Sequence, residues 1–223
     1  MNFCKIFFSK LTKAYDDPLF YDIIGYDHIK RLFRMALNSD SAIHILLVGP
    51  PASAKTMFLT SLMIHLKNSY FADGGNSSKA GMIDYVFENR PRYLLVDEID
   101  KMASKDQALL LNLMETGIIS ETKYGKTRSA QTKVSVFATS NYVKRISTPL
   151  RSRFFTVELE PYTYKQFCDI SAGLLSHHNI NESIANVIAN SVWSKSQNIR
   201  DCIKIGTMAK SIEDVKFLVE TFI

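Results

Sequence analysis

The sequence predicts an α/β fold in which a parallel sheet is covered by helices on both faces and is followed by a small all-helical lid domain. Two observations carry this prediction. Short apolar runs, typical of strands buried on both faces, alternate with helical patterns up to about Leu159. After Pro161 the spacing of apolar residues becomes purely helical. The 223 residues, 46% of them hydrophobic, are enough to bury the core of such a fold.

Local spacing defines the expected elements. Predicted strands are apolar runs bounded by turn residues, and predicted helices repeat apolar residues every three or four positions. Strands are expected at residues 43–48, 70–71, 93–96, 134–138 and 155–159. Helices are expected at residues 28–37, 55–67, 105–115, 163–176, 182–193, 198–209 and 211–221. The predicted organisation is an N-terminal arm (1–22), an α/β domain (23–160) with a hairpin inserted at about 118–133, and the lid (161–223).

The amino-acid composition argues against several classes of protein. Charged residues make up 22% of the chain, which argues against general disorder. The three cysteines, Cys4, Cys168 and Cys202, fit neither a disulfide framework nor a CxxC metal pair. No apolar run approaches the roughly 18 residues of a membrane span, so we expect no membrane partner and a cytoplasmic location. The net charge of +5 fits either an anionic partner or ordinary solubility.

The segment GPPASAKT lies between a predicted buried strand and a predicted helix, which is the context of a phosphate-binding loop. Lys55 would reach the β- and γ-phosphates of ATP, and the Thr56 hydroxyl would bind Mg²⁺. The pattern departs from GxxxxGK[ST] at Ala54, and the alternative is a plain loop that caps a helix. The expected phosphate cradle is Gly49, Pro50, Pro51, Ala52, Ser53 and Ala54.

Two adjacent carboxylates end the next predicted central strand, LLVDE. In a parallel sheet this strand would deliver them beside the phosphate-binding loop. Asp97 is expected to hold the Mg²⁺ shell, and Glu98 to polarise the attacking water. A strand that ends in a solvated acidic turn is the alternative interpretation.

Further polar residues follow the later strands. Asn141 ends the third central strand and is expected to orient the water or contact the γ-phosphate; alternatively, it satisfies its own backbone. Arg151 and Arg153 precede the next strand. Arg153, which comes just before the aromatic residues that begin that strand, is the preferred arginine finger for the γ-phosphate of a neighbouring subunit. An exposed, solvated arginine pair is the alternative.

Together these residues resemble the AAA+ superfamily of P-loop NTPases, and most nearly the minichromosome maintenance helicase core and RuvB, the Holliday-junction branch-migration motor. The SSKAG segment and VDEIDKM at 96–102 resemble the former, and LRSRF resembles the arginine-finger box of both. The resemblance covers the chain from about residue 22 onward. It implies an ATP hydrolase that binds ATP and Mg²⁺ between the subunits of a homo-oligomer, expected as a hexameric ring, with a loading or adaptor protein as a further partner.

The resemblance also suggests contacts outside the central motifs. YDIIGYDHIKRLFRMAL resembles the adenine-contacting stretch of RuvB, so Ile23 and Ile24 are candidate contacts. Arg200 begins a lid helix where these families carry a second sensor. The DNA-binding modules of both families, and the insertion that minichromosome maintenance proteins carry in their second helix, find no counterpart. DNA binding is therefore expected from this domain's own loops or from partners.

The inserted hairpin is the feature that speaks to the substrate. It carries four cations, including Lys133, against the single acid Glu121. Cations that contact phosphates bind nucleic acid without sequence preference, and a tip aromatic can stack on bases. The alternative is a solvated hairpin that packs on a neighbouring subunit. The candidate nucleic-acid contacts are Lys123, Tyr124, Lys126 and Arg128.

Two classes of function remain open from the sequence. The first is a nucleic-acid motor, such as a DNA helicase, a branch-migration motor or a replication-initiation ATPase. The second is a protein-remodelling ATPase that resembles the MoxR and chelatase group, and a clamp-loader-like switch is a weaker third. Four cations in the hairpin favour DNA as the partner, because a protein-remodelling pore is expected to present an apolar loop.

Overall fold

The computed structural model describes residues 18–223 except 22, 24, 52, 78 and 124–125. The chain divides into two compact units between Leu159 and Glu160. The predicted arm lies almost wholly outside the described residues. No helix in the described part of the chain is both long and apolar enough to cross a membrane.

The first unit is built on a five-stranded sheet with the order β2-β3-β6-β1-β7, and all its neighbouring strands are parallel. Its strands are β1 (Ile45–Val48), β2 (Ser69–Asp73), β3 (Tyr93–Asp97), β6 (Ser135–Ser140) and β7 (Phe155–Glu158). Its longer helices are α2 (Asp27–Leu37), α3 (Lys55–His65), α4 (Lys79–Asn89) and α5 (Ser104–Thr116). Its short helical segments are η1 (Pro18–Phe20), η2 (Ile99–Lys101), η3 (Val143–Arg145) and α6 (Thr148–Arg151).

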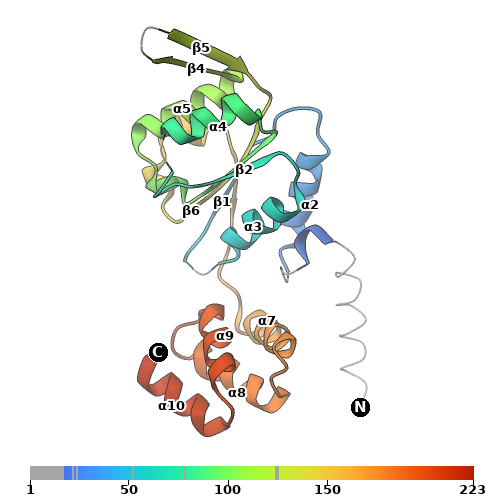
Figure 1. The fold of residues 1–223 in the computed structure, drawn as a ribbon. Coiled ribbons are helices and arrows are strands. Elements are labelled where there is room, and N and C mark those ends of the chain that lie inside the picture. The colour runs from blue at the N-terminus through green and yellow to red at the C-terminus, as the bar shows by residue number, and fades with distance from the viewer. Residues whose placement is uncertain (1–17, 22, 24, 52, 78, 124–125) are drawn as a thin grey trace. The chain divides into compact units, whose positions relative to one another are not determined.

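Helices α2 and α3 cover one face of the sheet, and α4 and α5 cover the other (Figure 1). The period-2 alternation of the strands builds a separate core on each face. Ile45 and Leu47 of β1 face α2 and α3, where Phe33 and Phe58 stack with ring centroids 5.5 Å apart. Leu46 faces the opposite side with the apolar residues of α4 and α5. β3 and β6 alternate in the same way. The prediction of a parallel sheet covered on both faces is confirmed.

Several boundaries differ from the predictions for local reasons. Strand β1 begins at Ile45 because the Ile43 amide donates to the Ser135 side chain at 3.1 Å instead of joining the ladder. Helix α3 ends at His65, since Leu66 adopts an extended backbone. Helix α4 is absent from the predicted elements.

An antiparallel hairpin follows α5, with strands β4 (Ile118–Lys123) and β5 (Lys126–Gln131), and β4 contacts α4 and α5. Gly117, with φ at +66°, ends α5 and begins the hairpin; a Cβ there would come within 2.7 Å of the Thr132 carbonyl oxygen. Lys133 lies beyond β5, and its ammonium donates to the Asp40 carbonyl oxygen. Lys133 therefore lies two residues after the end of the paired strands.

The second unit contains four helices, α7 (Tyr164–His177), α8 (Glu182–Trp193), α9 (Ile199–Met208) and α10 (Ile212–Phe222). Capping boxes at Thr163 and Ser211 fix where α7 and α10 begin. Their apolar faces form one cluster that includes Phe167 and Ile188. Helix α9 approaches α7 closely at Gly206, where a Cβ would lie 2.4 Å from Leu175. The helical spacing after Pro161 thus predicted this unit correctly.

Candidate functional site

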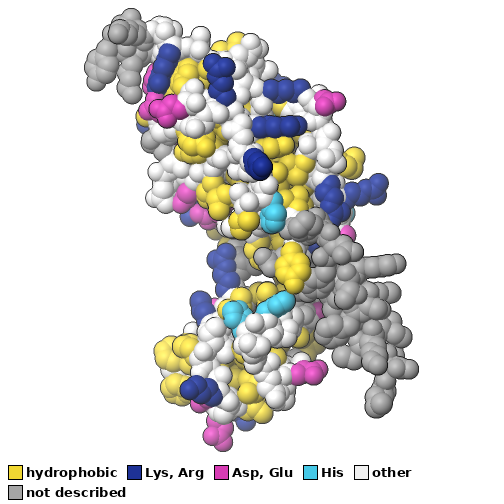
Figure 2. All heavy atoms as spheres, turned by 45° about the vertical axis from the view of Figure 1, so that its right-hand side comes forward, with side chains coloured by type: hydrophobic (Ala, Val, Ile, Leu, Met, Phe, Trp, Pro, Cys, Tyr) yellow, Lys and Arg dark blue, Asp and Glu magenta, His cyan; other side chains and the backbone are white. Residues whose placement is uncertain are grey.

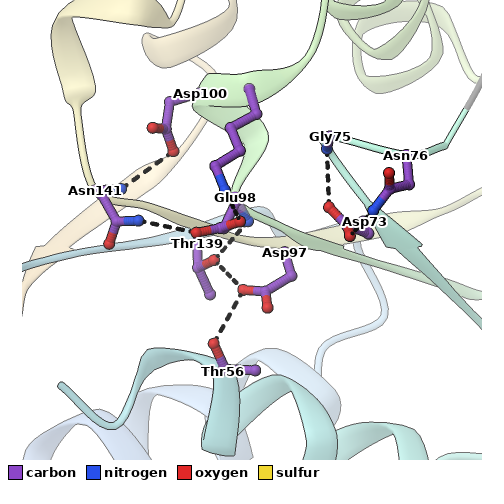
Figure 3. Close-up of polar contacts among 10 residues, drawn as sticks. Thr56, Asp73, Gly75, Asn76, Asp97, Glu98, Asp100, Thr139 and Asn141 are labelled. Atoms are coloured by element: carbon purple, nitrogen blue, oxygen red, sulfur yellow. Dashed lines mark hydrogen bonds and ion pairs between the residues drawn. The ribbon is translucent and has the colours of Figure 1, made fainter. Parts of the chain in front are cut away.

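The candidate site lies at the carboxyl ends of β1, β3 and β6, which meet at one edge because the strands are parallel (Figure 3). Val48 of β1 lies opposite Ser140 of β6, and Val96 of β3 lies opposite Ala138. This register brings the loop after β1 and the polar ends of β3 and β6 into contact. Thr56 on α3 reaches Asp97 at the end of β3, with 3.3 Å between Oγ1 and Oδ1.

The loop after β1 folds around the buried ammonium of Lys55. Nζ donates to the carbonyl oxygens of Gly49 at 2.9 Å and Pro50 at 2.6 Å, and to Ser53 Oγ at 2.9 Å. A Cβ on Gly49 would lie 2.8 Å from the Leu159 carbonyl oxygen, so the first position requires glycine. A phosphate that entered the loop would replace these oxygens as the hydrogen-bond partner of the ammonium.

Ala54 replaces the second glycine of the usual loop pattern, and the backbone explains why this is tolerated. Its φ of −67° and ψ of 10° are open to any L-residue, so glycine is not required. Its methyl group packs in the core that contains Phe58. Helix α3 begins directly after it without a side-chain cap, and such a helix N-terminus favours an anion. Pro51 is exposed within the loop, and Ala52 lies outside the described residues.

Asp97 and Glu98 diverge at the end of β3. Asp97 Oδ1 accepts hydrogen bonds from Thr56 and, at 2.5 Å, from Thr139 Oγ1. Glu98 adopts a left-handed backbone with φ at 52°, which is unfavourable for a residue with a side chain. Its amide donates to Thr139 Oγ1 at 2.9 Å. One buried hydroxyl from β6 thus fixes both members of the acidic pair.

The Glu98 carboxylate has two partners. Asn141 Nδ2 donates to Oε1 at 3.1 Å, and Lys101 Nζ lies 2.5 Å from Oε2. The Asn141 amide donates to Asp100 Oδ1 at 3.1 Å, so the residue is held at both ends. The hydrogen bond to Glu98, followed by the Glu98 charge, raises the pKa of Lys101. Lys101 is not among the residues predicted from the sequence, although its position three residues after Glu98 indicates the contact.

A turn after β2 forms the neighbouring wall of the site and was also missed. The Asp73 carboxylate accepts from the Gly75 amide at 2.8 Å and from Asn76 Nδ2 at 2.6 Å, and these hydrogen bonds lower its pKa. The Gly74 amide donates to the Asp97 carbonyl oxygen at 2.7 Å. A Cβ on Gly74 would lie 2.3 Å from the Glu98 carbonyl oxygen, so only glycine fits. The double glycine of the sequence was the available signal.

The remaining candidates lie away from these strand ends. The Arg153 guanidinium forms an ion pair with Glu115 near the end of α5. Arg151 ends α6 and is exposed. Ile23 is buried in the core with α2 and α3, and its carbonyl oxygen accepts from Lys30. Ile24 lies outside the described residues. Arg200 belongs to the second unit, in the first turn of α9.

In the hairpin, the side chain of Arg128 already has partners within the chain. Its guanidinium pairs with Glu121 at 2.6 Å, pairs with Asp84, and lies 4.4 Å from the ring centroid of Phe87. The hydrogen bonds to Asp84 and Glu121 raise its pKa. Lys123 and Lys126 form the last pair of the ladder, while Tyr124 lies outside the described residues.

Comparisons with known proteins match this architecture. The family model "ATPase family associated with various cellular activities (AAA)" matches residues 45–162. DNA replication licensing factor Mcm2 of Drosophila melanogaster is 27% identical over 173 residues, which cover 59% of this chain and 20% of that protein. DNA replication licensing factor Mcm6 of Drosophila pseudoobscura pseudoobscura is 23% identical over 222 residues, which cover 83% of this chain and 26% of the relative.

Solved structures agree on the fold. The Thermotoga maritima RuvB Holliday junction branch migration motor superimposes with a TM-score of 0.65 at 22% identity, covering 88% of this chain and 69% of that chain. A mutant of the same RuvB gives a TM-score of 0.69 at 21% identity, covering 89% and 70%. The chain spans only about a fifth to a quarter of the curated relatives described above, whose covered shares are 20% and 26%.

Proposed function

Because the chain belongs to the AAA family of ATPases, we propose that it binds ATP with Mg²⁺ and hydrolyses it at interfaces between subunits. The observation that carries this proposal is the meeting of Thr56, Asp97, Glu98 and Asn141 at one edge of the sheet. Thr56 directly follows Lys55, whose ammonium the loop encloses, and Thr56 is linked through Asp97 and Thr139 to Glu98 and Asn141. Phosphate, metal and water-activating groups thus lie within one continuous set of contacts.

The residues present suit a magnesium ion. Thr56 Oγ1 and Asp97 Oδ1 are hard oxygen donors, and they lie 3.3 Å apart. When bound, Mg²⁺ would neutralise charge that develops on the phosphates. Thr56 and Asp97 would hold the ion, while Lys55 would exchange its carbonyl partners for phosphate oxygens.

Glu98 is the proposed general base. Its carboxylate would take a proton from the attacking water, and the Asn141 amide on Oε1 would fix its direction. Because the backbone of Glu98 is left-handed, its side chain points in a different direction from that of Asp97. The two carboxylates therefore serve different purposes, one at the metal and one at the water.

Side chains from other parts of the chain, and from a neighbouring subunit, would complete the nucleotide site. Arg153 is the proposed arginine finger, acting on the nucleotide of an adjacent subunit; for that it must leave Glu115. Arg200 in the second unit is the proposed second sensor, and the stretch around Ile23 and Ile24 is the proposed adenine contact. A homo-oligomer, most simply a hexameric ring, would bring these groups together.

We further propose that ATP hydrolysis drives a DNA motor of the helicase or branch-migration type. The similar proteins are described as DNA replication licensing factors and as a Holliday junction branch migration motor, which supports this class. Lys123 and Lys126, beside the hairpin tip, are the proposed phosphate contacts. A loading or adaptor protein would be a further partner.

One observation favours the second candidate, a protein-remodelling ATPase like the MoxR and chelatase group. Glu121 and Asp84 neutralise Arg128, and Lys133 lies outside the hairpin strands, so fewer cations than expected face a polymer. On the face seen in Figure 2, Lys and Arg side chains of the first unit are scattered among other residues and form no continuous patch. The hairpin then has less charge to hold DNA.

ATP turnover measured without polymer, with single-stranded DNA and with branched DNA, at several salt concentrations, tests both steps. Turnover without polymer supports the ATPase, and stimulation by DNA that weakens with salt supports the motor. Lys55→Ala should abolish turnover and most binding of a fluorescent ATP analogue, whereas Lys67→Ala, an exposed lysine just after α3, should retain both. Near-normal nucleotide binding by Lys55→Ala would refute the phosphate site.

A further inference from the structure

A small hollow lies at the amino ends of the central strands, at the edge of the sheet opposite to the candidate nucleotide site. Tyr93 begins β3 and Ser135 begins β6, and these two lining residues lie opposite each other in the ladder. Ala42, a third lining residue, precedes β1. The volume of the hollow is about 290 Å³. This value is close to the lower limit of small-molecule sites, roughly 300 Å³.

The apolar part of the lining is mostly buried. Ala36 and Tyr93 are buried, and Ala42 is half-buried. The ring of Tyr93 stacks on Phe137 of β6, with 6.0 Å between the ring centroids. This packing fixes the aromatic side chain, so the hollow offers a preformed apolar surface to a ligand.

Two exposed cations come from the starts of neighbouring strands. Arg92 directly precedes β3, and its guanidinium carbon lies 5.5 Å from the centroid of the Tyr93 ring. Within the described part of the chain, no carboxylate pairs with this guanidinium. Lys133 lies two residues before β6, and its ammonium donates to the Asp40 carbonyl oxygen. Because an ammonium carries three protons, Lys133 can donate to a ligand as well.

Two serine hydroxyls in the lining add further donors. Ser39 Oγ accepts from the Ser41 amide at 3.0 Å, and the buried Ser135 Oγ accepts from the Ile43 amide at 3.1 Å. Each hydroxyl also has a proton to donate, and neither proton has an acceptor among the residues that the structure describes. Asp40 is the only acid among the described lining residues, and it is exposed. The hollow is therefore rich in donors and carries a net positive charge.

We propose that this hollow binds a small organic anion. The carboxylate or phosphate group of the ligand lies between Arg92 and Lys133, and its apolar part lies against Tyr93 and the two alanines. An ionised carboxylate or phosphate offers acceptors for these donors, and a guanidinium can hold it through two parallel hydrogen bonds. The inference goes beyond the proposed ATPase function and does not depend on it, because none of these residues belongs to the nucleotide site.

Titration of the full chain with phenyl phosphate and with benzoate, followed by the NMR signals of backbone amides, tests the site. The amide signals of Ser41, Tyr93 and Ser135 should shift in a saturable way with at least one probe at millimolar concentration. Shifts with phenyl phosphate alone assign a phosphate to the hollow, and shifts with benzoate alone assign a carboxylate. Benzyl alcohol has the same ring without a charge and should produce none. Binding at the loop after β1 is distinguished because it shifts the signals of Gly49 and Thr56 instead.

Variants separate a built site from a general attraction of anions to a basic surface. Arg92→Ala should weaken binding about tenfold to a hundredfold, because it removes hydrogen bonds to a charged group, and Arg92→Lys should weaken it less. Arg90→Ala removes the same charge from an exposed arginine two residues earlier and is the matched control. Ala42→Phe keeps every cation but fills the hollow, so it should abolish binding; Ala42→Leu replaces it should the phenylalanine variant fail to fold. The absence of saturable shifts with either probe, or normal affinity in both Arg92→Ala and the filled variant, would overturn the inference.

Discussion

The hydroxyl of Thr139 donates to Asp97 Oδ1 at 2.5 Å. Thr139 is fully buried, and its two partners, Asp97 and Glu98, lie more than 40 positions earlier in the chain. It also accepts the Glu98 amide at 2.9 Å. One side chain on β6 therefore fixes the geometry of the acidic pair on β3.

Thr139→Val should destabilise the protein by about 1–3 kcal/mol, because it leaves the Glu98 amide without its partner at unchanged side-chain shape. Thr139→Ser keeps the hydroxyl and should be destabilised less. Urea unfolding of both variants measures the difference. Equal stability of the valine variant and the normal protein would contradict the bridging role.

Glu98→Gln should retain ATP binding but reduce turnover by roughly two to four powers of ten, the range of general-base contributions. The amide keeps the shape of the side chain but cannot take the proton from water. A fluorescent ATP analogue and a phosphate-release assay measure the two properties separately. Glu88→Gln, an exposed acid on α4, is the control. Turnover above half the normal rate would exclude Glu98 as the base.

Arg153→Ala should reduce turnover by about 10³–10⁵ if the guanidinium acts as an arginine finger. Within its own chain, Arg153 pairs with Glu115 on α5. Mixing Arg153→Ala with Lys55→Ala subunits, each inactive alone, should restore part of the turnover through interfaces with one intact copy of each residue. Arg151→Ala should retain more activity. No recovery in assemblies shown to be mixed would indicate a structural role.

Replacing Lys123 and Lys126 by alanine should weaken DNA binding similarly for every sequence. Removing each phosphate-binding cation should reduce the slope of log affinity against log salt by about 0.7–0.9. Arg128→Ala should change the slope less, because Glu121 and Asp84 already neutralise that cation.

The second unit offers a control for the Lys123/Lys126 variant, and the hairpin tip offers a further test. Lys165 and Lys195 are exposed lysines of the second unit, and their double alanine variant removes the same net charge. Tyr124→Ala should weaken binding by about 1–3 kcal/mol if a base stacks on the ring. Unchanged affinity and salt slope in the Lys123/Lys126 variant would favour the protein-remodelling function.

His44 should make stability sensitive to mild acid. Burial lowers its pKa to about 4, and its Nδ1 accepts from the Val136 amide at 3.1 Å. The unfolded chain, with a histidine pKa of about 6.5, binds more protons below that pH, so the free energy of unfolding falls as pH drops from about 6.5 towards 4. A decrease of about 1–2 kcal/mol is expected between pH 7 and pH 5. In urea unfolding, the His44→Gln variant should show a weaker pH dependence of the free energy of unfolding. An equal decrease in both proteins would mean that groups other than His44 cause it.

The sequence by itself determined the order and type of most elements, the loop after β1 and the acidic pair at the end of β3. These features are local, because buried strands read as continuous apolar runs and the loop residues are contiguous. Helix α4 was not predicted, because the sequence before it is rich in glycine and serine. That alanine can replace glycine at position 54 could be explained only from the φ angle of Ala54 in the structure.

Tertiary structure alone decided which distant residues meet. The order β2-β3-β6-β1-β7 places Thr139 on Asp97 and Asn141 on Glu98, and no local pattern encodes that order. The same holds for Arg128, whose partner Asp84 lies on α4. Side-chain partners across a sheet depend on strand adjacency and register, which the packing of the whole core selects. The residue types of the candidate site were therefore readable from the sequence, while the contact between Lys101 and Glu98 depends on the turn geometry at Glu98.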